Sequence, residues 1–143
     1  MKKRLICLGM ALIFSLAGGC SSAPPPPSFY PVRGQIILDG QPVRFANVSL
    51  TPKDLVNDDA PAATGRTDAN GEFSIQTYMG PGYDGALPGE YWVSLATPAR
   101  SPGDANGVKP SAIPKQYRHP KSSKISITVR EETNDLGTIR LRS

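Results

Sequence analysis

Reactive side chains are scarce in this chain. It has one histidine, His119, and two cysteines, Cys7 and Cys20, among its 143 residues. A zinc site built from two histidines of one chain is therefore excluded, and neither a G-x-S-x-G nucleophile elbow nor an S-x-x-K pair occurs. His119 stands between Arg118 and Pro120 in a polar stretch, which is typical of an exposed bystander. We predict no catalytic residues, no metal site and no cofactor.

The first apolar run is too short for a permanent transmembrane anchor. It extends from Leu5 to Ala17, whereas a spanning helix needs about 20 residues. Basic residues precede it and small residues follow it, which is the layout of a secretory signal peptide. We expect residues 1–19 to be removed on export.

A strong excess of positive charge is lacking once that segment is removed. The formal net charge of +4 comes from 16 basic and 12 acidic residues. Lys2, Lys3 and Arg4 supply three of the positive charges, which leaves 13 basic residues against 12 acidic ones. No basic run and no interleaving of basic with aromatic residues remains to bind phosphates and bases. We therefore expect no binding to nucleic acid.

Cys20 ends the stretch LAGGC, which resembles the lipobox of bacterial lipoproteins. The resemblance implies that the nucleophilic thiol of Cys20 carries a diacylglycerol and that the new amino terminus is acylated, for example with palmitate. Ala17 departs from the pattern, because leucine is commoner at that position. The alternative is a free or disulfide-bonded cysteine after ordinary cleavage. Cys7 is excluded as its partner because it lies in the removed segment.

Lipid on Cys20 makes the membrane an expected partner. Two acyl chains hold a protein stably on a bilayer, whereas one is marginal. Ser21 follows the cysteine where an aspartate would signal inner-membrane retention, so the same resemblance favours the outer membrane in bacteria with two membranes. The expected location is therefore exported and anchored, at the outer membrane or in the periplasm or at the cell surface.

Residues 20–31 are expected to form a tether. Four consecutive prolines, Pro24–Pro27, favour polyproline II, which rises about 3.1 Å per residue. We prefer a semi-rigid spacer that lifts a domain off a lipid surface to the alternative, a ligand for a proline-recognition module.

Helical periodicity is lacking from residues 32–143, and an alternation of period two takes its place. Phe73 and Ile75, for example, alternate with Glu72, Ser74 and Gln76. Such runs indicate strands, and they cover residues 32–38, 45–51, 63–67, 72–76, 91–96, 125–130 and 139–142. About seven strands without helices between them predict one all-β domain, an antiparallel β-sandwich. The connections 53–63 and 98–122 stay irregular and are either functional or mobile.

Four blocks follow one another in this domain: VRGQIILDGQPVRFANVSLTP, ATGRTDANGEFSIQTY, DGALPGEYWVSL and IPKQYRHPKSSKISITVREETNDLGTIRL. In this order they resemble the carboxypeptidase regulatory-like domain of small bacterial lipoproteins, which is transthyretin-like (prealbumin-like). The resemblance covers essentially all of residues 32–143. It implies a seven-stranded Greek-key sandwich that is exported and anchored, with no established enzymatic activity.

The stretch TDANGEF is dense in oxygen ligands and glycine. An EF-hand calcium loop needs further acidic ligands after the glycine, a final glutamate and flanking helices, whereas strands are expected on both sides here. Asp68, Asn70 and Gly71 suit the first, third and fourth positions of a type I β-turn that closes a hairpin. We interpret them as a structural turn, with calcium as the alternative.

Trp92 is the one tryptophan of the chain, and it is opposite in phase to the apolar residues beside it. An outward tryptophan is a candidate binding surface for a glycan or a protein. It would equally be covered by Phe29 and Tyr30 of the tether or by the connection 98–122. Covering is the preferred interpretation.

These observations predict a lipid-anchored extracytoplasmic β-sandwich with a binding, adhesive or structural role at the cell envelope and no catalysis. Its partner is expected to be an envelope protein or a glycan. Two alternatives are an accessory domain that serves an envelope hydrolase and a carbohydrate-binding module that uses Trp92.

The Cys20→Ala variant tests the lipid anchor. Because alanine has no sulfur to acylate, we expect the variant either to be released from membranes or to remain uncleaved, as fractionation and the mass of the chain will report. Continued membrane fractionation of a cleaved variant would contradict the lipoprotein interpretation.

Overall fold

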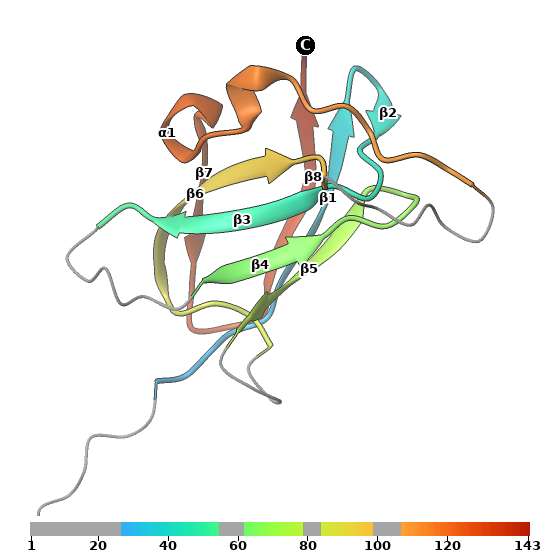
Figure 1. Ribbon diagram of the computed structural model, residues 1–143. Helices are drawn as coiled ribbons and strands as arrows, with labels where there is room; N and C mark the ends of the chain where they lie inside the picture. Colours follow the sequence, from blue (N-terminus) through green and yellow to red (C-terminus); the bar gives the residue numbers. More distant parts are fainter. Residues whose placement is uncertain (1–26, 55–61, 79–83, 99–106) are drawn as a thin grey trace, which may run out of the picture.

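Strands make up most of the regular structure. The computed structural model describes residues 27–54, 62–78, 84–98 and 107–143 (Figure 1). Its elements are β1 (Val32–Leu38), β2 (Gln41–Pro42), β3 (Asn47–Pro52), β4 (Ala63–Arg66), β5 (Glu72–Thr77), β6 (Gly89–Ala96), the 3-10 turn η1 (Lys115–Tyr117), α1 (Pro120–Ser123), β7 (Ile125–Val129) and β8 (Asn134–Leu141). The expected all-β class is confirmed. The predicted signal peptide and Cys20 lie outside the described residues.

The sheet differs from the expected seven antiparallel strands. A two-residue strand, β2, pairs with the end of β1, so the sheet has eight strands. The second difference in the sheet is that β8 pairs with β1 in parallel. The chain leaves β7, which is bound to β6, and crosses to the other edge of the sheet before β8 begins, so β8 runs in the direction of β1.

The long connection 98–122 also differs from the expectation that no helix separates the strands. Its described part contains η1 and α1. Pro120 is the first residue of α1 and follows an extended His119, which suits proline because its fixed φ fits the first turn and its missing N–H is not needed there. The helix ends where Lys124 adopts a left-handed conformation, with φ of 55°.

One strand, β5, changes partner halfway along its length. Residues 72–74 pair with β1, and residues 75–77 pair with β4. The order of the sheet is β2-β1-β5-β4-β3-β6-β7, with β8 on the outer side of β1. Figure 1 shows β1 and β8 running at a steep angle to β3, β4 and β6. The sheet therefore curls on itself at β5.

The period-two alternation decides which side chains the curled sheet encloses. In β5 every second residue is buried, namely Phe73, Ile75 and Thr77, and the residues between them are exposed. A strand places successive side chains on opposite faces, so the apolar set of each strand points inward. The core includes Val32, Ile36, Val48, Leu50, Phe73, Ile75, Tyr91, Val93, Leu95, Ile113, Ile127, Val129 and Leu141.

The chain enters the domain at the end away from α1 (Figure 1). The backbone N–H of Tyr30 donates to the Ala86 carbonyl at 2.9 Å, and the N–H of Ala86 donates back to Tyr30 at 3.0 Å. The N–H of Asn134 donates to the Pro31 carbonyl at 2.8 Å. These bonds fix the last residues of the tether to the body of the domain, so the position of chain entry is defined.

Candidate functional site

Trp92 lies in the middle of β6, where the strand has neighbours on both sides. It is paired with Thr51 of β3 and with Ser126 of β7. Tyr91, Val93 and Leu95 are buried in the core, whereas Trp92 is half-buried. The alternation of the strand therefore places the indole on the outer face of the sheet, as its phase in the sequence predicts.

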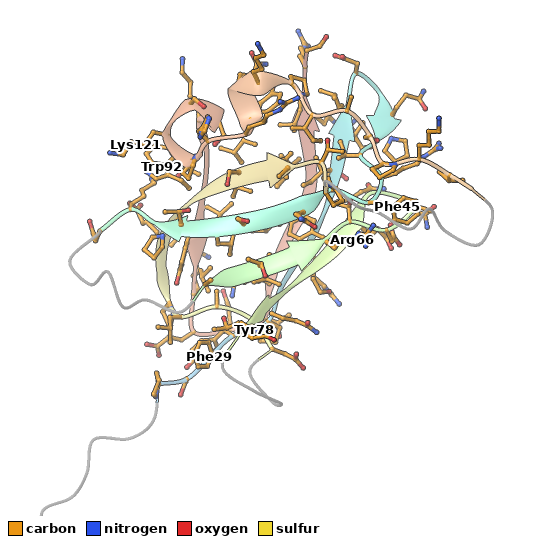
Figure 2. All side chains as sticks on the ribbon, in the orientation of Figure 1. Phe29, Phe45, Arg66, Tyr78, Trp92 and Lys121 are labelled. Atoms are coloured by element: carbon orange, nitrogen blue, oxygen red, sulfur yellow. The ribbon has the colours of Figure 1, made fainter. Side chains whose placement is uncertain are left out.

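The long connection, not the tether, packs beside Trp92. Tyr30 of the tether is bonded to Ala86, and Figure 2 shows Phe29 at the opposite end of the domain from Trp92. The helix α1 contacts β6, and Lys121 of α1 lies next to Trp92 in Figure 2. Of the two covers that the sequence left open, the structure places the connection at this face.

A cavity of about 280 Å³ opens beside the indole. We call it the Trp92 pocket; it is lined by Thr51, Pro52, Lys53, Trp92, His119, Pro120 and Lys121. These residues come from the end of β3, the middle of β6 and the start of α1. His119 is exposed, as expected of a bystander, but it belongs to the wall of this pocket.

The lining of the Trp92 pocket includes two cations, Lys53 and Lys121. The Lys53 ammonium lies 4.6 Å from the centroid of the Trp92 ring, a cation–π contact worth about 0.5–2 kcal/mol. Its carboxylate partner is Glu90, at 3.5 Å. The Lys53 side chain is only 23% exposed whereas that of Glu90 is 60% exposed. Lys121 is exposed at the rim.

The wall formed by the long connection is held in place by buried groups. Ile113 is buried in the core and Ser123 of α1 is buried as well. The Arg118 Nε donates to the Ile113 carbonyl at 2.9 Å, and the Tyr117 hydroxyl donates to the Arg142 carbonyl at 2.6 Å. The part of the connection that carries His119, Pro120 and Lys121 is therefore fixed against the sheet.

A larger and shallower groove of about 580 Å³ runs over the outer faces of β8, β1, β5 and β4. Two pairs of its polar side chains are bonded to each other: Arg33 bonds Asp135 at 3.2 Å, and the Thr138 hydroxyl donates to the side-chain amide oxygen Oε1 of Gln35 at 3.2 Å. The Gly137 N–H and the Arg33 guanidinium lower the pKa of the Asp135 carboxyl. We therefore interpret the groove as a solvated face of the sheet and not as a binding site.

Asp68, Asn70 and Gly71 lie in the tight turn between β4 and β5. One carboxylate oxygen of Asp68 accepts the backbone N–H groups of Asn70 at 2.8 Å and Glu72 at 2.9 Å. The N–H of Gly71 donates to the Asp68 carbonyl at 3.2 Å. The φ of Gly71 is 78°, in the region that glycine tolerates best. The Asp68 side chain thus serves its own backbone.

Close packing requires glycine at position 71 as well. A Cβ there would stand 2.5 Å from the Ile36 carbonyl oxygen and 3.2 Å from the Val43 nitrogen. The turn therefore fits under the end of β1, where the N–H of Ile36 donates to the Gly71 carbonyl at 2.9 Å. Asp68, Asn70 and Gly71 therefore have a structural role at the corner of the sheet.

Within the four described ranges, no group of three or more His, Cys, Asp or Glu side chains is placed to hold a metal ion. In the same ranges, no helix has both the length and the apolar character to cross a membrane. Cys20 is outside these ranges, so its lipidation stays a prediction.

Comparisons with known proteins give little more. No protein-family model matches the chain, and no curated protein matches it. Among solved structures, a 9R-lipoxygenase from Cyanothece PCC8801 is similar over 79% of this chain and 16% of the lipoxygenase chain, with a TM-score of 0.40 and 17% identity. A likeness of this size informs neither fold nor activity.

Sequence reasoning found Trp92 but missed most of the pocket around it. Pro52 follows the predicted strand 45–51, and Lys53, Pro120 and Lys121 fall in the connections 53–63 and 98–122, which the sequence predicts to be irregular. The usable signal was the outward phase of a large aromatic residue in a central strand. Its neighbours come from segments about 30 to 40 residues away along the chain, and only the folded structure brings them together.

The Gly71→Ala variant tests the structural interpretation of the turn, with Gly40→Ala as its control. Both glycines have a positive φ, 78° and 80°, but a Cβ at Gly40 meets no atom within 4 Å. We expect Gly40→Ala to lower the free energy of unfolding by about 1 kcal/mol from backbone strain and Gly71→Ala to lower it by about 1–3 kcal/mol more. Urea denaturation with and without calcium measures both. Equal losses, or a calcium-dependent stability of the wild-type chain, would refute the interpretation.

Proposed function

We propose that the chain is a lipid-anchored extracytoplasmic β-module that binds a component of the cell envelope through the Trp92 pocket. The observation that carries the proposal is the pocket itself, a half-buried tryptophan with two lysines and two prolines around it. A large aromatic residue in a preformed cavity is the usual anchor of a binding site. The pocket lies at the end of the domain opposite the chain entry (Figure 2).

We further propose that residues 32–143 form a Greek-key, transthyretin-like sandwich of the carboxypeptidase regulatory-like kind. The all-β class, the strand positions and the four sequence blocks support this assignment. In the same proposal, residues 1–19 are the removed signal peptide, residues 20–31 are the tether, and lipid on Cys20 holds the protein on a membrane. This arrangement points the Trp92 pocket away from the lipid surface.

A binding role is preferred to catalysis. The side chains that line the Trp92 pocket offer aromatic, apolar and cationic contacts, and no carboxylate or hydroxyl nucleophile is paired with a base among them. Such a set suits recognition of a ligand by shape and charge. The expected partner is an envelope glycan or protein.

The Trp92→Ala variant tests this function in a pull-down from detergent-solubilised cell envelopes. Tyr78→Ala is the matched control, because Tyr78 is also aromatic, is 95% exposed and lies outside the pocket. We expect the wild type and Tyr78→Ala to retain the same stoichiometric glycan or protein and Trp92→Ala to lose it, with circular dichroism showing that all three are folded. If folded Trp92→Ala retains that partner, the pocket is not the binding site.

A further inference from the structure

We propose that the Trp92 pocket binds an acidic saccharide, with a sugar ring against the indole and a carboxylate between Lys53 and Lys121. This inference rests on the proposed function and names the chemical class of its ligand. It follows from the lining of the pocket, from the state of Lys53, and from the position of the pocket in the sheet and in the domain.

The floor of the pocket suits one ring. Trp92, Pro52 and Pro120 supply apolar surface, and the volume of about 280 Å³ lies just below the range of about 300–1,000 Å³ typical of sites for drug-sized ligands. The C–H groups of a sugar ring carry partial positive charge and pack on the negative π-face of an indole. A single sugar unit is therefore of a size and surface character that suit the floor.

The two lysines indicate a negatively charged ligand. The Lys53 side chain is mostly buried, yet its ammonium is satisfied by the Trp92 ring at 4.6 Å and by an exposed carboxylate at 3.5 Å. Lys121 adds a second positive charge at the rim and has no ion pair among the residues that the structure describes. A ligand carboxylate would draw the Lys53 ammonium off the π-face and open that face to the sugar ring.

An extended peptide is a poorer occupant because β6 has no open edge at Trp92. The strand is paired with β3 on one side and β7 on the other at this residue. Peptides that add to a sheet need unpaired main-chain groups at its edge. Recognition here depends on side chains, which matches a ring with an attached charge.

A lipid headgroup of the anchoring membrane is disfavoured by position. The pocket and α1 lie at one end of the domain, and residues 27–31 enter at the other (Figures 1 and 2). A tether at the entry end therefore directs the pocket toward material beyond the membrane surface. Acidic saccharides combine a ring with a carboxylate, which are the two features that the pocket lining suits.

The test uses the full chain in non-ionic detergent and the fluorescence of Trp92, which is its one tryptophan. The probes are oligogalacturonate as the acidic saccharide, a maltooligosaccharide as the neutral one, polyglutamate as the acidic peptide, and phosphatidylglycerol vesicles. We expect oligogalacturonate alone to change the emission in a saturable way. Added salt should weaken the binding, because salt screens contacts between exposed charges.

Charge-neutral variants locate the contact. Lys53→Gln and Lys121→Gln should each weaken oligogalacturonate binding about three- to tenfold. Lys109→Gln is the matched control, since Lys109 is exposed and outside the pocket, and it should change the affinity less than about twofold, the effect of a charge acting only at long range.

Each other outcome overturns the inference in a distinct way. If the neutral saccharide binds equally well, the ligand does not need a charge. If polyglutamate or the vesicles bind equally well, the pocket does not recognise a saccharide. If no probe binds, the assigned ligand class is wrong. Equal effects of Lys109→Gln and Lys121→Gln would show that net charge, not the pocket, attracts the ligand. If these tests fail while Trp92→Ala still loses its envelope partner, the proposed function stands and only the acidic saccharide is wrong.

Discussion

The change of partner halfway along β5 is the constraint on which the rest of the structure depends. Its first half is paired with β1 and its second half with β4, so the sheet curls at this strand. Strands that pass from one sheet to another make the corners of packed β-structures in the same way. Gly65 of β4 makes the close approach possible, because any Cβ there would clash with the carbonyl of Ser74. The inward residues of the other strands then meet in one core.

Closing the sheet also determines where binding is possible. One face of each strand is buried in the core and the other lies outside it. In β6, Tyr91 and Val93 point into the core and Trp92 lies on the outer face. The long connection returns across this outer face because Ile113 and Ser123 are buried as it passes. The packing that stabilises the fold therefore also forms the Trp92 pocket. Its wall is held in place by the buried residues Ile113 and Ser123.

The sequence allowed much of the fold to be predicted and little of the site. Alternation located β5 and the buried side of β6, and the chemistry of Asp68 and Gly71 located the turn between β4 and β5, since these signals act within a few residues. The parallel pairing of β8 with β1 depends on contacts about 100 residues apart, and no local pattern specifies it. Likewise, Lys53 and Lys121 join Trp92 only after the chain has folded.

We expect the Trp92 pocket and the curled sheet to form one cooperative unit. The most direct measurement is equilibrium unfolding of the full chain in urea, followed at the same time by Trp92 emission and by far-ultraviolet circular dichroism. If the core at the β5 corner holds the pocket, both signals should change at one midpoint, as two-state unfolding requires. A change in Trp92 emission at distinctly lower urea, before the loss of strand signal, would show that the pocket unfolds separately from the sheet.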